Sequence, residues 1–136
     1  MAGQQQVFDV VRNKWVALTP EEWVRQHLLH FFMVDYHFPK GRMSVEKKVS
    51  LNGMSKRSDI VLYDQDGRPI MLVECKAADI ALSNDTFRQA AMYNLTMRVP
   101  YLMITNGREA LCASINLAQG SFQILEGLPD FLFPEN

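Results

Sequence analysis

The apolar run from Ile70 to Val73 is the feature of this sequence that most restricts its fold. Consecutive apolar positions leave a strand no polar side to expose to water, so residues 69–77 predict a central strand that is covered on both faces. Glu74 and Lys76 follow the run at once. Ionisable side chains are costly to bury unless they are paired or bind something, so these two residues mark a candidate site.

Two segments carry the signals of helices. Residues 19–32 have Thr19 as a capping residue, Pro20 at the first helical position, and Glu22 to complete a Thr-x-x-Glu capping box. Residues 85–98 are the second helical segment. Its candidate capping residues are Ser83, Asn84 and Asp85.

Strand patterns fill most of the remaining chain. They cover residues 44–51, 58–64, 69–77, 101–105 and 109–118, with two short strands within 7–18 and a further one at 121–128. Polar turns are predicted at 52–57 and 65–68, and Asn106-Gly107 is a strong hairpin signal. The order is helix, three strands, helix, then two or three strands. We therefore expect an α/β fold with a central mixed sheet flanked by helices.

Three ionisable residues are expected to converge at one end of this sheet. Alternate side chains of a strand share a face, so Glu74 and Lys76 point the same way. Asp59 begins the preceding predicted strand, and the short turn at 65–68 makes the two strands antiparallel neighbours. The end of one strand then lies beside the start of the other, which brings the three side chains together.

The chemistry of this group points to a metal ion. Two carboxylates at close range repel each other unless a cation lies between them. Mg²⁺ prefers oxygen ligands and keeps several waters, so it suits Asp59 and Glu74. A neighbouring lysine can orient a bound water or stabilise charge on a phosphate oxygen. The group suits metal-assisted hydrolysis of phosphodiesters.

Asp59 followed by Glu74-Cys75-Lys76 resembles the D…(D/E)xK core of the PD-(D/E)XK nuclease superfamily. The predicted order of helices and strands is also similar to the αβββαβ core of that superfamily. Its members usually have proline before the aspartate, whereas Ser58 stands here.

The second helix strengthens the resemblance. Gln89 and Tyr93 lie four residues apart, hence on one helical face. They resemble the Q-x-x-x-Y motif of a nuclease branch that includes type I restriction R subunits. The string "TPEEWVRQ … RSDIVLYD … VECKA … RQAAMYN … ITNG", from about Trp15 to Gly107, looks most like the nuclease domain at the N-terminus of those subunits.

The resemblance implies a single nuclease-like domain over 1–136 that hydrolyses DNA with Mg²⁺, or with Mn²⁺ as a substitute. It implies that Asp59 and Glu74 bind the metal, and that Lys76 positions or activates water. It places Gln89 beside the lysine, and has Tyr93 support or contact the nucleic acid.

The first helix can supply a further metal-binding acid, as many members of the superfamily do. Glu22 is the first candidate for this role in metal binding and catalysis, and Glu21 is the weaker one. Glu22 also has a purely structural explanation, because the capping box requires this residue type at its position.

A basic segment is a candidate surface for phosphate contacts. Residues 40–57 hold six Lys and Arg residues against Glu46 as the one acid, and the predicted substrate contacts are Lys47, Lys48, Lys56 and Arg57. A strand edge guarded by solvated lysines is the alternative explanation. The net charge of −1 neither supports nor excludes a nucleic-acid partner, because acids elsewhere cancel the local excess.

The remaining ionisable residues and thiols give weaker signals. His27 and His30 have a spacing that can hold zinc, although His37 is the only further ligand of that type. Cys75 is expected to face the core side of its strand, away from Glu74 and Lys76. With Cys112 it forms no Cys-x-x-Cys pair, which favours a reducing cytoplasm. No segment approaches the roughly 18 apolar residues of a membrane helix.

Two rival interpretations stay open. The chain can be a catalytically silent nuclease-fold module that binds DNA or a protein partner, or a plain α/β domain with chance charges. Cutting both DNA strands needs two active sites, so a homodimer or a partner that loads the protein onto DNA is a further expectation.

Overall fold

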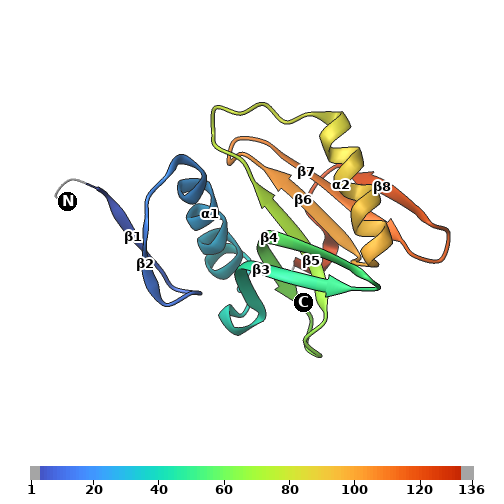
Figure 1. Ribbon diagram of the computed structural model, residues 1–136, viewed down its shortest axis with the longest axis horizontal. Coiled ribbons are helices and arrows are strands. Elements are labelled where there is room, and N and C mark those ends of the chain that lie inside the picture. The colour runs from blue at the N-terminus through green and yellow to red at the C-terminus, as the bar shows by residue number, and fades with distance from the viewer. Residues whose placement is uncertain (1–3, 133–136) are drawn as a thin grey trace.

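The structure is a computed structural model that describes residues 4–132 (Figure 1). Its elements are β1 Gln6–Asp9, β2 Lys14–Ala17, α1 Pro20–His30, a π-helical turn Phe31–Asp35, a 3-10 turn Lys40–Arg42, β3 Met43–Leu51, β4 Met54–Tyr63, β5 Pro69–Cys75, α2 Asn84–Met97, β6 Tyr101–Thr105, β7 Ala110–Asn116, β8 Ser121–Leu125 and a 3-10 turn Asp130–Leu132. No helix within residues 4–132 combines the length and the apolar character needed to cross a bilayer.

A six-stranded mixed sheet organises the fold. Its strand order is β3-β4-β5-β6-β7-β8, with β5 and β6 parallel and all other neighbours antiparallel. The hairpin β1–β2 forms a separate two-stranded sheet beside α1. The predicted α/β fold with a mixed sheet is confirmed.

Each face of the sheet has its own hydrophobic core. On one face, Leu29 of α1 packs in a cluster with Met71 and Val73 of β5. On the other face, Phe87 of α2 packs in a cluster that includes Leu72. Met71, Leu72 and Val73 are fully buried, which confirms that this apolar run is a strand covered on both faces.

The turn predicted at residues 52–57 is shorter than expected. β3 and β4 are joined by Asn52 and Gly53 alone, with φ of 53° and 77°. Two consecutive residues at positive φ are typical of the tight hairpin turn whose twist matches that of the flanking strands. β4 therefore begins at Met54 and not at Ser58, and it carries Lys56 and Arg57 on a strand instead of in a loop.

The helix ends follow local rules with one exception. The Oγ1 atom of Thr19 accepts a hydrogen bond from the Glu22 amide at 3.1 Å. The Oγ atom of Ser83 caps α2 in the same way, by accepting from the Thr86 amide at 3.3 Å. The return half of the predicted capping box is absent, because the Thr19 amide donates to the carbonyl of Ala17. The carboxylate of Glu22 is engaged elsewhere.

Charged groups anchor the β1–β2 hairpin to α1. Asp9 is fully buried at the end of β1, and its Oδ2 atom accepts from Arg12 Nε at 2.8 Å and from Gln26 Nε2 at 2.9 Å. Arg12 Nη2 in turn donates to Glu22 Oε1 at 2.7 Å. The hairpin is thus joined to the helix by a connected network of hydrogen bonds and ion pairs.

Asp9 gives this network a dependence on pH. Burial by itself would raise the pKa of Asp9, but hydrogen bonds from Arg12 and Gln26 outweigh it and hold the pKa below its usual range. The carboxylate therefore adds stability above its unfolded pKa of about 3.9, and this contribution is lost as the pH falls through the lowered folded pKa. We expect Asp9→Asn to cost about 1–3 kcal/mol near neutral pH, as measured by urea unfolding, and less at lower pH.

Asp66→Asn is the matched control, because Asp66 lies exposed in the turn between β4 and β5. It should follow the parent protein at every pH. An Asp9→Asn variant whose stability deficit stays constant down to about pH 3 would contradict the assigned role of this carboxylate.

Candidate functional site

Asp59 lies where β4 runs past the end of β5. Ile60 and Val73 are paired across the two strands, and Asp59 and Glu74 are the next residues towards this end of the sheet. The Oδ1 atom of Asp59 accepts from Arg25 Nη2 at 2.9 Å, and its Oδ2 atom accepts from the amide of Cys75 at 2.7 Å. Two donors from different elements therefore fix the orientation of this carboxylate.

Glu74 is paired with a lysine of the neighbouring strand. Lys56 Nζ lies 2.7 Å from Glu74 Oε1 and 5.5 Å from the centre of the Tyr93 ring. The Tyr93 hydroxyl donates a hydrogen bond to the carbonyl of Ser55. The structure thus brings together three of the predicted site residues, Lys56 on β4, Glu74 on β5 and Tyr93 on α2.

Lys76 lies just beyond the end of β5. It follows the last residue of β5, and its amide donates to the carbonyl of Thr105 at 2.8 Å, which holds this segment against β6. Its side chain is half-buried and forms no ion pair with the described residues 4–132. The ammonium group is therefore free to interact with a ligand.

Glu21 is the acid of α1 that shares this environment. Partial burial raises the pKa of Glu21, and the Asp59 carboxylate raises it further, whereas Arg25 and Lys76 lower it. These effects require the three charged groups to lie near Glu21. The structure places Glu21, Asp59 and Lys76 in one electrostatic neighbourhood.

Glu22 is more deeply buried than Glu21 and has its own set of partners. It is 6% exposed, and its Oε1 atom accepts from Arg12 Nη2 at 2.7 Å and from Arg25 Nη1 at 2.9 Å. Gln26 Nε2 donates to its other oxygen at 3.1 Å. Arg25 contacts Glu21 as well as Glu22, so the two acids differ in burial and in partners, and the role of Glu22 in metal binding stays a prediction.

Most of this chain matches a known protein family. Residues 20–129 match the model of the family described as Type I restriction enzyme R protein N terminus (HSDR_N). The chain belongs to the HSDR_N family. No curated protein sequence matches it significantly.

The fold of this HSDR_N chain is also similar to that of a solved structure. It is a DUF820 protein of Anabaena variabilis ATCC 29413 that carries a provisional nuclease assignment, with a TM-score of 0.56 and 11% sequence identity. The match covers 93% of this chain and 83% of the other. The resemblance to the type I R subunit nuclease domain is confirmed at the level of family, and the fold is nuclease-like.

Gln89 projects from α2 without a protein partner. Its side chain is exposed and makes no hydrogen bond to Lys76 or to any other residue of the described chain. Ala91 of the same helix is fully buried, so Gln89 lies on the open side of α2. The role given to Gln89 by the Q-x-x-x-Y motif of HSDR_N-like nucleases stays a prediction.

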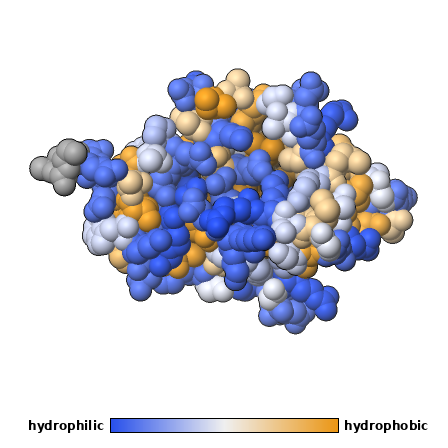
Figure 2. Space-filling view, in the orientation of Figure 1, coloured by the Kyte–Doolittle hydropathy of each residue, from blue (hydrophilic) through white to orange (hydrophobic). Residues whose placement is uncertain are grey.

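The basic residues of the HSDR_N chain follow the β3–β4 hairpin. Lys47 and Lys48 are exposed on β3, which is an edge strand of the sheet, and Lys48 is paired across the ladder with Arg57 of β4. Figure 2, drawn in the orientation of Figure 1, shows hydrophilic residues in the middle of the visible face, between α1 and α2. An exposed basic edge suits both explanations, phosphate binding and protection of the strand edge.

The donor atoms of Asp59 and Glu74 fit a hard divalent cation. Each carboxylate oxygen can accept two hydrogen bonds, and each Asp59 oxygen makes one, so a lone pair remains on both. Mg²⁺ commonly takes one or two carboxylates and completes its shell with waters and phosphate oxygens. Within residues 4–132 no three His, Cys, Asp or Glu side chains form a preassembled metal cage, neither His27, His30 and His37 nor Asp59, Glu74 and Glu22.

The two thiols belong to the core. Burial raises the pKa of Cys75 far above its usual value and that of Cys112 to about 11. Cys75 packs with Val73 in the core beside α1, as predicted for a small interior residue. Both thiols therefore stay neutral at physiological pH and are poor nucleophiles.

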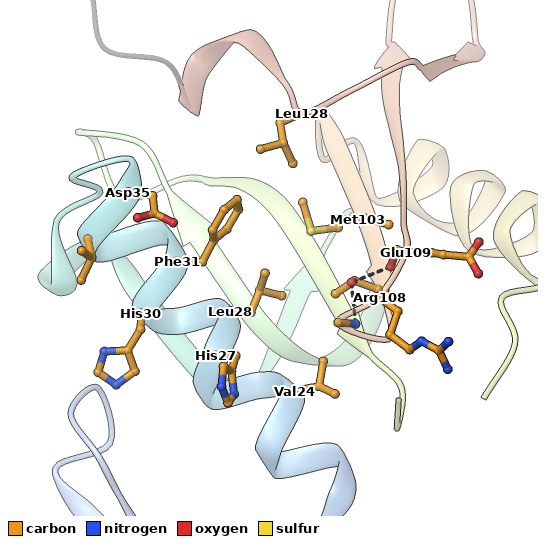
Figure 3. Close-up of a pocket in the computed structure, with 14 residues that line it drawn as sticks. Val24, His27, Leu28, His30, Phe31, Asp35, Met103, Arg108, Glu109 and Leu128 are labelled. Carbon is orange, nitrogen blue, oxygen red and sulfur yellow. Dashed lines mark hydrogen bonds between the residues drawn. The ribbon is translucent and has the colours of Figure 1, made fainter. Parts of the chain in front are cut away.

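A cleft of about 660 Å³ opens elsewhere, between α1 and the β6–β7 turn (Figure 3). Val24, Leu28 and Phe31 line its helical side, and Arg108 and Glu109 stand on the opposite side. Asp59, Glu74 and Lys76 are not among its lining residues, so the cleft is separate from the charged group at the end of β5.

Sequence reasoning missed two residues of the charged site, Arg12 and Arg25. Arg25 is 5% exposed and contacts Asp59, which lies 34 positions further along the chain. The sequence offered one signal for Arg25, which is that it stands among the apolar residues of the predicted helix, next to Val24 and three residues before Leu28. A charged residue on a buried face must have partners, although the sequence does not name them.

Proposed function

We propose that this protein is a divalent-metal-dependent deoxyribonuclease that hydrolyses phosphodiester bonds. One observation supports the proposal: the strand positions of Asp59 and Glu74 are neighbours where β4 passes the end of β5, and Lys76 follows Glu74 two residues later. Membership of the HSDR_N family and the nuclease-like fold support it.

Each residue has a role that follows from its surroundings. Asp59 and Glu74 would hold a Mg²⁺ or Mn²⁺ ion, whose positive charge would polarise a phosphate and lower the pKa of a bound water. Lys76 orients the attacking water or donates to a phosphate oxygen, because its ammonium forms no ion pair within residues 4–132. On α1, Glu21 is the more exposed candidate acid, whereas the carboxylate of Glu22 is already bound by Arg12 and Arg25.

Lys56 adds a positive charge to the proposed site. Its Nζ atom lies 2.7 Å from Glu74 Oε1, which leaves the Oε2 atom of Glu74 open to a metal. The ammonium has three N–H donors, so it can also pair with a phosphate oxygen. Lys47, Lys48 and Arg57 add positive charge along the β3–β4 hairpin, and Tyr93 of α2 lies against Lys56.

A second candidate function is a catalytically silent module that binds DNA or a protein partner. The ion pairs Asp59–Arg25 and Glu74–Lys56 favour it, because both acids are already neutralised by the chain itself. Such a module would use the basic hairpin without the acids. A homodimer, or a partner that loads the protein onto DNA, would serve either function.

The deciding experiment is cleavage of supercoiled plasmid by the purified chain with Mg²⁺ or Mn²⁺. We expect nicking that chelation stops and that Asp59→Asn reduces at least about 100-fold, because the variant loses a charged metal ligand. Asp66→Asn should cleave like the parent. Plasmid that is shifted in a gel but never cut, with either metal, would favour the binding module instead.

A further inference from the structure

Arg25 lies among four carboxylates contributed by three elements. Its Nη2 atom is 2.9 Å from Asp59 Oδ1, 3.3 Å from Glu46 Oε1 and 3.8 Å from Glu21 Oε1. Its Nη1 atom is 2.9 Å from Glu22 Oε1. A single buried guanidinium therefore balances acids on α1, β3 and β4.

The two terminal nitrogens of Arg25 bind different acids. Nη1 faces the interior, where Glu22 also binds Arg12 and joins Arg25 to the network that anchors the β1–β2 hairpin. Nη2 faces the candidate site, where Asp59 is held. Because the guanidinium is planar and rigid, its interior attachment fixes where Nη2 stands beside Asp59.

We propose that Arg25 is a positioning residue that limits this site to one divalent ion. The proposal rests on the proposed function and deepens it. A second ion that shared Asp59 would have to bind Oδ1 and draw its other ligands from Glu46 and Glu21. Arg25 Nη2 occupies that place and contacts all three carboxylates, so its positive charge and its volume both exclude a cation there.

The rest of the Asp59 carboxylate stays available. Its Oδ2 atom is held by the amide of Cys75, one residue beyond Glu74, so a first ion approaches on the side of β5 without meeting Arg25. Removing the guanidinium would leave three acids facing one another across a space of cation size. Carboxylates in that position attract a divalent ion in place of the lost charge.

The test is the number of Mn²⁺ ions bound per chain, measured by calorimetric titration and by the electron paramagnetic resonance of bound Mn²⁺. We expect one ion for the parent, and two for Arg25→Gln, with the spin coupling of two ions that share a carboxylate. Adding Glu46→Gln to that variant should return the number to one. Arg108→Gln, in the exposed β6–β7 turn, is the matched control and should bind one.

Arg25→Gln leaves Glu22 short of a partner and can fail to fold. The second variant is therefore Arg25→Met combined with Glu22→Met, because replacing both members of a buried ion pair by apolar groups of similar volume is often tolerated. It should also bind two ions. Two ions on the parent, or one ion on the folded variants, would overturn the role of Arg25. No ion on the parent would instead refute the proposed function, which is a separate outcome.

Discussion

Lys76→Met should reduce metal-dependent plasmid cleavage by at least about 100-fold, the loss typical when one preorganised donor to a reacting oxygen is removed. The ammonium of Lys76 is half-buried and has no acid partner within residues 4–132, so substitution breaks no ion pair there. The variant should keep the melting temperature and the Mn²⁺ affinity of the parent. The measurement is the initial rate of nicking at saturating Mg²⁺.

Lys14→Met is the matched control for this prediction. Lys14 is an exposed lysine of β2, on the hairpin that packs beside α1, and its loss should leave the nicking rate unchanged. The assigned role would be wrong if Lys76→Met cut DNA at the parental rate. Loss of cleavage together with loss of folding would show a structural role for Lys76.

Glu22→Ala should destabilise the protein by about 3–5 kcal/mol, the usual cost of removing one partner from a buried ion pair. Glu22 is the shared acceptor of Arg12 and Arg25, and its loss leaves both guanidinium groups short of a partner in the interior. The measurement is the free energy of unfolding in urea. Glu22→Gln should recover part of the loss, because its amide oxygen can still accept from one arginine.

Glu21→Ala, one residue away, should give the opposite result. Its side chain is 51% exposed and its shortest ion pair, to Arg25, spans 3.8 Å, so the free energy of unfolding should change by less than about 1 kcal/mol. Plasmid cleavage should fall instead, because Glu21 lies beside Asp59. Equal effects of the two alanine variants on stability would contradict the separation of a structural glutamate from a site glutamate.

The sheet could be predicted from the sequence because its signals are local. The apolar run of β5 and the short turn before it predicted the antiparallel pairing of β4 with β5. This pairing brings the positions of Asp59 and Glu74 to the same end of the sheet. The length of β4 could not be predicted in the same way. Polar residues after Asn52-Gly53 read as a turn, yet Lys56 and Arg57 are extended because β3 offers a full set of backbone partners.

The capping-box bond predicted for Glu22, which the structure lacks, has a similar explanation. The capping box is a local pattern, and it assigned the Glu22 carboxylate to the backbone of Thr19. Two arginines far from the cap compete for the same carboxylate with charged hydrogen bonds, which are stronger than a bond to a neutral amide. Their partners lie up to 34 positions apart, beyond the reach of any local pattern.

The network around Glu22 includes residues that precede the part of the chain matched by the HSDR_N family. Similarity to the HSDR_N family starts at residue 20, at the first turn of α1. Asp9 and Arg12, which complete the surroundings of Glu22 and Gln26, come before that point. A boundary drawn from family similarity alone would therefore cut the chain through the middle of an interior charge network. The shortened protein would keep Glu22 and Gln26 but lose Asp9 and one of the two arginines that bind Glu22.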